Sequence, residues 1–137
     1  MARPLHWETN ASGYAAVWAQ ENSRESLFAA MKRKEVYATT GPRIVVRVFA
    51  GWSFEDSDAY APNLTSLGYS GGVPMGGTLT GVGGDAPRLL IQASKDPTGA
   101  NLDRVQLVKG WLSESGELNE SVYDVAVSDN RTKPRCW

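Results

Sequence analysis

Residues 22–50 read NSRESLFAAMKRKEVYATTGPRIVVRVFA and decide the fold, because this stretch contains one helix, one stop and one strand. Asn22 is of a residue type that caps helices with its side chain, and Glu25 three positions later completes a capping box. The helix is therefore expected to begin near Ser23. A run of basic residues then places positive charge at the negative end of the helix dipole, so the helix is expected to end near Glu35.

The predicted helix has one apolar face. Leu27, Phe28 and Met31 fall together at helical spacing. A helix this short is marginal alone and gains its stability from packing. We therefore expect this face to dock onto the sheet.

A turn at Gly41 and Pro42 separates the helix from a strand, because glycine permits a turn and proline lacks a donor. Residues 43–50 then alternate with the period of two that is typical of a strand. One face is apolar and the other is mixed. The apolar face carries Ile44, Val46 and Val48, and the mixed face carries Arg43, Val45, Arg47 and Phe49.

Three later segments show strand patterns, and turn-forming residues separate them. They are RLLIQASK (88–95), RVQLVKGWL (104–112) and SVYDVAVS (121–128). In the last segment we expect Tyr123, Val125 and Val127 to point inward.

The order of these elements predicts an α+β fold that is mainly β, an antiparallel sandwich-like sheet unit preceded by one amphipathic helix. A chain of 137 residues fits a single domain. Its expected parts are a lead-in (1–21), the helix (22–35), a β-sandwich-like unit (36–128) and a loose polar tail (129–137).

Residues 51–87 are rich in glycine, proline and serine and show little periodicity, so they are expected to form a long loop. A loop of this length often hides an element, and MGGTLTG (75–81) is the best candidate for a missed strand. Glu55, Asp56 and Asp58 lack the glycine and distal glutamate of a calcium-binding EF-hand loop. They are expected to form a solvated acidic turn.

Composition argues against several classes of function. A formal net charge of −1 gives no field that recruits nucleic acid or an anionic membrane surface, and no apolar run is long enough to span a bilayer. The chain has one histidine, His6, and one cysteine, Cys136, which are too few for a transition-metal site built from histidine and cysteine ligands. No metal, cofactor, nucleic-acid partner or membrane association is therefore expected. The N-terminal residues lack the apolar segment of a signal peptide, so the compartment is not encoded.

Several blocks of the chain resemble the domain-of-unknown-function family 3604, in the same order. They are GYAAVWAQENSRESLFAAMKRKEVYATTGPRIVVRVFAGW (13–52), GGVPMGG (71–77), KDPTGANLDRVQLVKGWL (95–112) and VYDVAVSD (122–129). Members of that family look like relatives of the polymerase and histidinol phosphatase (PHP) superfamily, whose metal-binding barrel precedes segments like these. The resemblance implies that this chain is the C-terminal portion, and that the metal ligands and catalytic residues belong to the barrel.

The first functional hypothesis follows from that resemblance. The chain would be a catalytically silent accessory portion of a metal-dependent hydrolase, bordering the active site of a barrel that precedes it. The candidate bordering residues are polar groups in the most family-like blocks: Arg24, Tyr37, Thr39, Thr40, Arg43 and Lys109. Arginine suits an anionic group through bidentate contacts, although strand and turn positions alone also explain these residues.

The alternative hypothesis is a binding or interaction module. Aromatic residues on the long loop would grip a sugar or a partner protein, since binding residues concentrate on loops held by a rigid scaffold. These residues are Trp52, Phe54, Tyr60 and Tyr69. The same side chains can instead close the end of the sandwich.

The C-terminal strand also predicts a partner. The sequence departs from the family pattern after Ser128, where members continue with further sandwich material. The strand at 121–128 is therefore expected to lack neighbours that would follow Trp137 and to have an unprotected edge, because Asp124 is the one charge within it. We therefore expect self-association, through strand pairing or through the helix face that otherwise meets the barrel.

Overall fold

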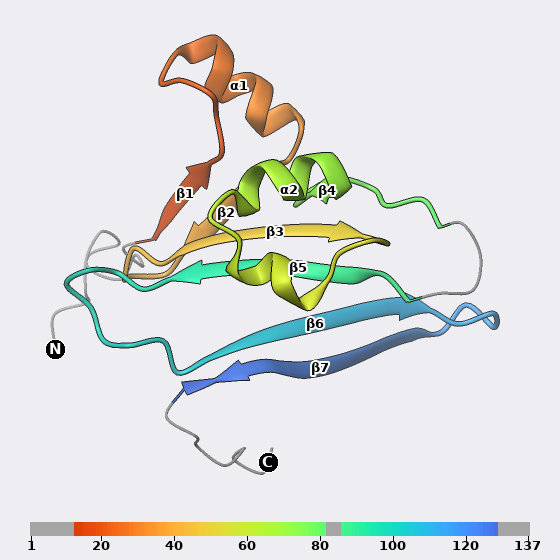
Figure 1. Ribbon diagram of the computed structural model, residues 1–137. Coiled ribbons are helices and arrows are strands. Elements are labelled where there is room, and N and C mark those ends of the chain that lie inside the picture. The colour runs from red at the N-terminus through yellow and green to blue at the C-terminus, as the bar shows by residue number, and fades with distance from the viewer. Residues whose placement is uncertain (1–12, 82–85, 129–137) are drawn as a thin grey trace, which may run out of the picture. The chain divides into compact units, whose positions relative to one another are not determined.

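The computed structural model describes residues 13–81 and 86–128, and the chain divides into two compact units, 1–96 and 97–137. Within the described residues it confirms the α+β, mainly β class, with seven strands in three antiparallel sheets (Figure 1). In chain order the elements are β1 (Tyr14–Val17), α1 (Arg24–Lys32), β2 (Val36–Thr39), β3 (Val45–Gly51), the 3-10 helix η2 (Asp56–Tyr60), α2 (Leu64–Gly71), β4 (Gly72–Pro74), β5 (Arg88–Ser94), β6 (Arg104–Leu112) and β7 (Leu118–Val127). The expectation of a single domain stays a prediction.

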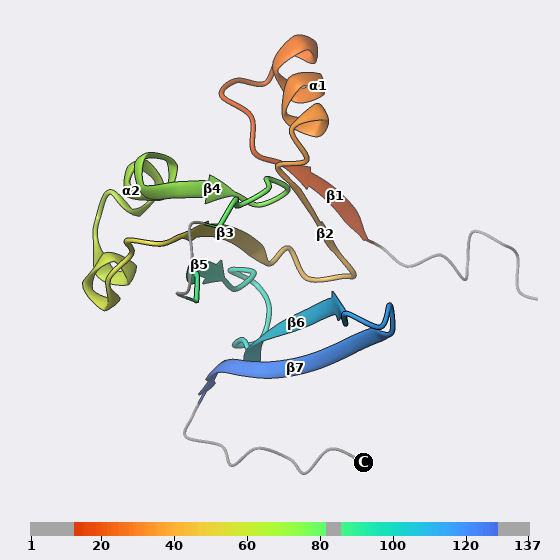
Figure 2. The ribbon, with the colours of Figure 1, turned by 90° about the vertical axis from the view of Figure 1, so that its right-hand side faces the viewer.

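The first unit contains two of the sheets. β1 and β2, which precede and follow α1 in the sequence, form an antiparallel pair, and their register places Val17 opposite Val36. The second sheet has the order β4-β3-β5, with all neighbours antiparallel. α2 packs against β4 and β3 of this sheet (Figure 2).

The core of the first unit lies where α2 meets the sheet. Its buried side chains are Phe49, Phe54, Leu64 and Leu90. Gly68 of α2 lies directly on the ring of Phe49, where a Cβ atom would overlap the ring carbons. The glycine therefore lets the helix approach the sheet closely.

The face of β3 that meets the core is not the uniformly apolar one. The mixed face is the one that meets the core, because Phe49 is completely buried on it. Arg47 lies on this same face, two residues away along the strand. An arginine on the core-facing side of a strand needs partners, and these form the candidate site described below.

The start and end of α1 both correct the prediction. The N-cap is Ser23, not Asn22, because Ser23 has an extended backbone and its Oγ accepts a hydrogen bond from the Ser26 amide at 3.3 Å. The helix ends at Lys32 rather than near Glu35. Lys34 adopts a left-handed conformation with φ 61°, which stops the helix there.

The apolar face of α1 does not dock onto the sheet as expected. Phe28 is 59% exposed and Met31 is 52% exposed, whereas Ala30 is completely buried. The helix therefore packs through its small alanine side and turns its large apolar side chains outward. Together with Leu27 these side chains line an open groove of about 630 Å³.

The long loop expected at 51–87 contains three elements that the sequence pattern did not predict. They are η2, α2 and the short strand β4. The strand expected at MGGTLTG is wrong, because residues 75–81 form a turn followed by irregular backbone. The pairing strand lies just before it, where Val73 is opposite Ala50 of β3.

The second unit is a β-hairpin of β6 and β7 with a register shift between Val105 and Gln106. The prediction that Tyr123, Val125 and Val127 point inward is wrong for Tyr123 and Val125, because both side chains are about half exposed. Both faces of the hairpin carry large apolar side chains that are exposed. On one face these are Val108, Leu112, Leu118 and Val122, and on the other Trp111 and Tyr123.

No helix in the described part of the chain is both long and apolar enough to cross a membrane. His6, Cys136 and the tail at 129–137 lie outside the described residues, as does the first part of the lead-in.

Candidate functional site

The end of α1 positions a buried carboxylate. The Lys34 amide donates to the Met31 carbonyl at 3.0 Å, and the Glu35 amide donates to the Ala30 carbonyl at 3.1 Å. This pair of bonds is the Schellman arrangement, which here places Glu35 directly after the left-handed residue. The Glu35 carbonyl in turn accepts from the Trp18 amide at 2.9 Å. The backbone of Glu35 is therefore held on both sides, and the residue is 4% exposed.

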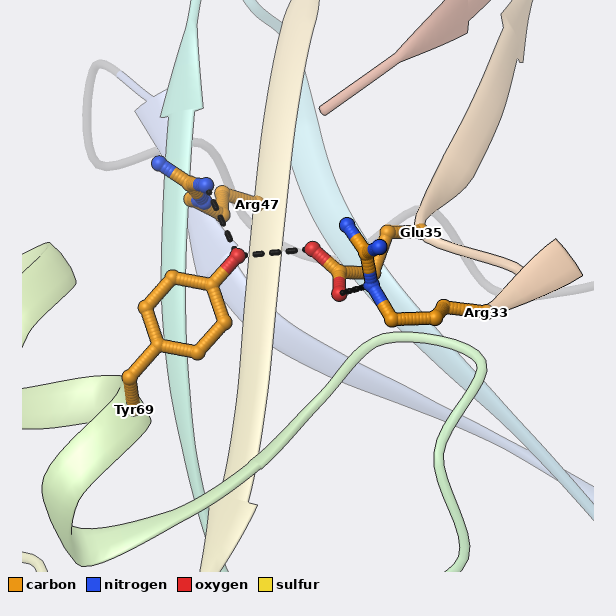
Figure 3. Close-up of polar contacts among 4 residues, drawn as sticks. All are labelled: Arg33, Glu35, Arg47 and Tyr69. Carbon is orange, nitrogen blue, oxygen red and sulfur yellow. Dashed lines mark hydrogen bonds and ion pairs between the residues drawn. The ribbon is translucent and has the colours of Figure 1, made fainter. Parts of the chain in front are cut away.

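Both oxygens of the Glu35 carboxylate are hydrogen-bonded (Figure 3). Arg33 donates from Nε to Oε1 at 2.8 Å, and the Tyr69 hydroxyl donates to Oε2 at 2.7 Å. Tyr69 comes from α2, 34 residues further along the chain, so the pair links the end of α1 to the helix that covers the sheet.

Arg47 of β3 completes the network. Its Nη2 donates to the Tyr69 hydroxyl and its Nη1 to Thr65 Oγ1, both at 3.2 Å. Thr65 and Tyr69 are four residues apart on α2, so they share the helical face that meets Arg47. The guanidinium also lies 4.0 Å from the centre of the Trp18 ring, a cation–π contact.

These groups shift the pKa values of the two acids in opposite directions. Burial by itself raises the pKa of Glu35, but the hydrogen bonds from Tyr69 and Arg33 and the charges of Arg33 and Arg47 outweigh it and hold the pKa below its ordinary value. Burial and the hydrogen bond to Glu35 raise the pKa of Tyr69, against the opposing effect of Arg47. At neutral pH the site therefore contains a carboxylate and a neutral phenol.

A cavity of about 370 Å³ opens over this network. It is lined by Trp18, Ala19, Gln20, Arg33, Glu35, Arg47 and Tyr69. The lining combines aromatic surface with two guanidinium groups, so the cavity offers both apolar contact and positive charge. We call it the Glu35 pocket.

The chain matches the family DUF3604, described as a protein of unknown function, over residues 1–135. It belongs to that family. The match extends past Ser128, where the sequence was expected to depart from the family pattern. No curated protein and no solved structure matches the chain.

The candidate bordering residues of the DUF3604 chain lie on different elements, five in the first unit and one in the second. Arg24 is exposed at the start of α1, on the rim of the groove lined by Phe28 and Met31. Lys109 lies in the second unit, where its Nζ is 5.1 Å from the centre of the Trp111 ring.

The four other candidates lie on or beside the β1–β2 pair. Thr39 Oγ1 accepts from the Tyr14 amide at 3.3 Å, and the guanidinium of Arg43 lies 5.3 Å from the centre of the Tyr14 ring. The Tyr37 ring is tilted against Trp18 at 6.0 Å, which places it next to the Glu35 pocket. Thr40 is exposed in the bend after β2.

The aromatic residues of the alternative binding loop separate into different environments. Phe54 is buried in the core, so its side chain is not exposed for a ligand. Trp52 is partly exposed and its Nε1 donates to the Thr80 carbonyl at 3.3 Å. Tyr60 is 91% exposed, and Tyr69 belongs to the Glu35 pocket.

Sequence reasoning missed most of the Glu35 pocket. Glu35 was read only as the end of a helix, and Trp18 and Arg33 were not singled out for function. One signal was present: Arg47 shares a strand face with Phe49, and a charge on a face that also carries a large apolar residue indicates a buried partner. The identity of that partner depends on α2, which the sequence pattern did not predict.

Proposed function

We propose that this chain is a catalytically silent accessory portion of a larger metal-dependent hydrolase, and that the outward face of α1 packs against the barrel of that protein. One observation carries the proposal. α1 buries Ala30 against its own unit and leaves Phe28 and Met31 more than half exposed. The resemblance to PHP-related proteins supplies the partner, because in those proteins a barrel precedes this helix.

The physical argument rests on the apolar area of the helix. Leu27, Phe28 and Met31 line this groove together with the polar residues Asn22, Arg24 and Glu25. Apolar patches with polar rims mark interaction surfaces on soluble proteins. Full burial of a large apolar side chain contributes about 1.5–3 kcal/mol, so covering the exposed parts of these side chains favours contact with a partner.

In this proposal the barrel supplies the metal and the catalytic groups, and this chain supplies a surface. Arg24 lies on the rim of the groove and is the bordering residue best placed to reach such a partner. Within residues 13–81 and 86–128, no three histidine, cysteine, aspartate or glutamate side chains are placed to hold a metal ion.

The upstream coding sequence gives the first test. We expect it to encode a barrel with histidine- and aspartate-rich ligand motifs in the same reading frame. An upstream region without such motifs contradicts the proposal and favours an independent module.

Binding between the purified barrel segment and this chain gives the second test. Phe28→Asp and Met31→Asp should each weaken binding at least about tenfold, because a charge placed in an apolar interface lacks a partner. Tyr60→Asp is the matched control, since Tyr60 is a highly exposed aromatic residue outside α1. Equal binding by all three variants contradicts the proposed interface.

The second candidate function is a binding module built on the 51–70 loop. A cavity of about 530 Å³ supports it, lined by Trp52, Ser53, Phe54, Glu55, Asp56, Ser57 and Arg88. An exposed indole beside carboxylates suits the apolar face and hydroxyl groups of a sugar. Total tryptophan fluorescence, followed while an oligosaccharide is added, tests this candidate. The oligosaccharide should quench the fluorescence of the native sequence, and Trp52→Phe should abolish this quenching.

A further inference from the structure

We infer that the Glu35 pocket binds the carboxylate group of a small organic acid. The inference is independent of the proposed packing of α1 against a barrel. It rests on the charge of the pocket, on the fixed position of Arg47, on the terminal nitrogens of Arg33 and on the aromatic surface beside them.

The charges in the pocket do not balance. Arg33 and Arg47 contribute two positive charges and Glu35 contributes one negative charge. The pocket therefore carries one net positive charge and favours an anion. Among the described residues Glu35 bonds Arg33 through Nε, so the terminal nitrogens of Arg33 are not used by this carboxylate.

Arg33 is held by one edge of its guanidinium. Its Nε bonds Glu35, and Figure 3 shows that its two terminal nitrogens extend beyond this contact. The Arg33 side chain is about half exposed, so a ligand can reach these nitrogens. Two parallel N–H groups of a guanidinium match the two oxygens of a carboxylate.

Arg47 is fixed before any ligand binds. Thr65 and Tyr69 accept hydrogen bonds from its guanidinium, and the Trp18 ring lies against it. Both of its hydrogen-bond acceptors are neutral oxygens, and within the described residues it makes no ion pair at salt-bridge distance. A preorganised guanidinium without a carboxylate partner strengthens binding of an anion because less side-chain entropy is lost.

The size and lining of the pocket narrow the ligand class. A cavity of about 370 Å³ is near the lower end of the range for small-molecule sites. The rings of Trp18 and Tyr69 offer apolar contact to the carbon skeleton of an acid. Inorganic phosphate has no carbon skeleton to contact these rings, so the lining favours an organic acid over phosphate.

Titrations of the full chain with benzoate, benzamide and inorganic phosphate test the inference. Binding is measured in each from the NMR shift of the Trp18 indole N–H. Benzamide is a neutral analogue of benzoate with the same ring. We expect benzoate to bind at least about tenfold more tightly than benzamide and than phosphate, a difference of about 1.4 kcal/mol. Binding of benzamide as tight as benzoate overturns the inference, and phosphate as the tightest ligand overturns the choice of a carboxylate.

Two variants separate a binding role from a structural one. Arg33→Lys keeps the charge and removes the fork, so benzoate binding should weaken at least about fivefold while the fold is retained. Glu35→Gln removes the negative charge, so it should strengthen the binding of anions, which loss of structure alone cannot do. Arg43→Lys, outside the pocket, is the control for Arg33→Lys and should leave binding unchanged. No change in Arg33→Lys, or weaker binding in a folded Glu35→Gln, overturns the inference.

Discussion

Lys34 ends α1 in a left-handed conformation, and Gly76 packs against the backbone of this residue. Gly76 itself has φ 82°, and a Cβ atom built there would overlap the Lys34 carbonyl oxygen. Two causes therefore require glycine at this position. The contact also holds the turn after β4 against the end of α1, next to the Glu35 pocket.

We predict that Gly76→Ala destabilises the first unit by more than the conformational cost alone, which is about 1–2 kcal/mol. Gly116→Ala is the matched control, because Gly116 also has φ 82° but has no neighbouring atom within 4 Å of its built Cβ. Native-state hydrogen exchange of β3 for the first variant and of β6 for the second measures the two losses. Equal losses would show that the contact with Lys34 contributes nothing.

The pKa of Glu35 gives a second prediction at the scale of single residues. Because folding lowers this pKa, ionised Glu35 contributes stability above the ordinary value of 4.5, and that stability is lost as the pH falls through the lowered pKa of the folded state. Urea denaturation at a series of pH values should show this loss in the native sequence. Glu35→Gln should flatten the acid dependence, whereas Glu25→Gln on the exposed side of α1 should retain it. A native sequence without acid dependence beyond that of Glu35→Gln contradicts the prediction.

At the scale of elements, α1 is amphipathic in sequence but packs through its smaller side. Ala30 is buried and Phe28 is exposed. A substitution at Ala30 should therefore lower the unfolding free energy more than one at Phe28, the reverse of what hydrophobicity alone predicts. Ala30→Leu should destabilise the isolated chain by about 1–3 kcal/mol, because it overpacks a closed contact.

Phe28→Ala should change the unfolding free energy of the isolated chain by less than about 0.5 kcal/mol, as is usual for surface positions. Thermal or urea denaturation of both variants measures the difference. A large loss in Phe28→Ala would mean that this face is covered in solution, either by the chain itself or by a second copy.

The hairpin of β6 and β7 has apolar side chains on both faces, as is expected for a sheet that is covered on two sides. An isolated two-stranded hairpin is at best marginally stable in water. The exposed apolar faces of this hairpin therefore favour contact with a further surface.

At the scale of the whole molecule, we predict that the isolated chain self-associates through this hairpin. Val122 on β7 lies opposite Val108 on β6, and both are more than half exposed. Light scattering across a concentration series should show a rising particle mass, and Val122→Lys should reduce it because it places a charge without a partner in the exposed apolar face of the hairpin. Ser121→Lys, one residue away and on the other face of β7, serves as the control for added charge. A strictly monomeric native chain at high concentration contradicts the prediction.

We also predict that the isolated chain holds no catalytic metal, since the proposal assigns the metal to the barrel. Elemental analysis after dialysis measures this directly. Stoichiometric zinc, manganese or iron in a site of several residues would contradict both the prediction and the division of roles in the proposed function.

Local patterns in the sequence determined much of this protein. The strand periodicity at 43–50, 88–95, 104–112 and 121–128 predicts β3, β5, β6 and β7 to within a few residues, because alternation is a property of neighbouring residues. The existence of α1 follows from local signals of the same kind, although the cap fell one residue later than expected.

Only the tertiary structure decided the rest. α2 forms from LTSLGYSG, which is poor in helix-forming residues, because Gly68 allows the helix to lie on Phe49. The buried face of α1 and the partner of Glu35 were likewise undetermined, since Tyr69 reaches that carboxylate only after α2 covers β3. Contacts between distant residues depend on how the elements pack, and a period of two or 3.6 residues carries no information about that packing.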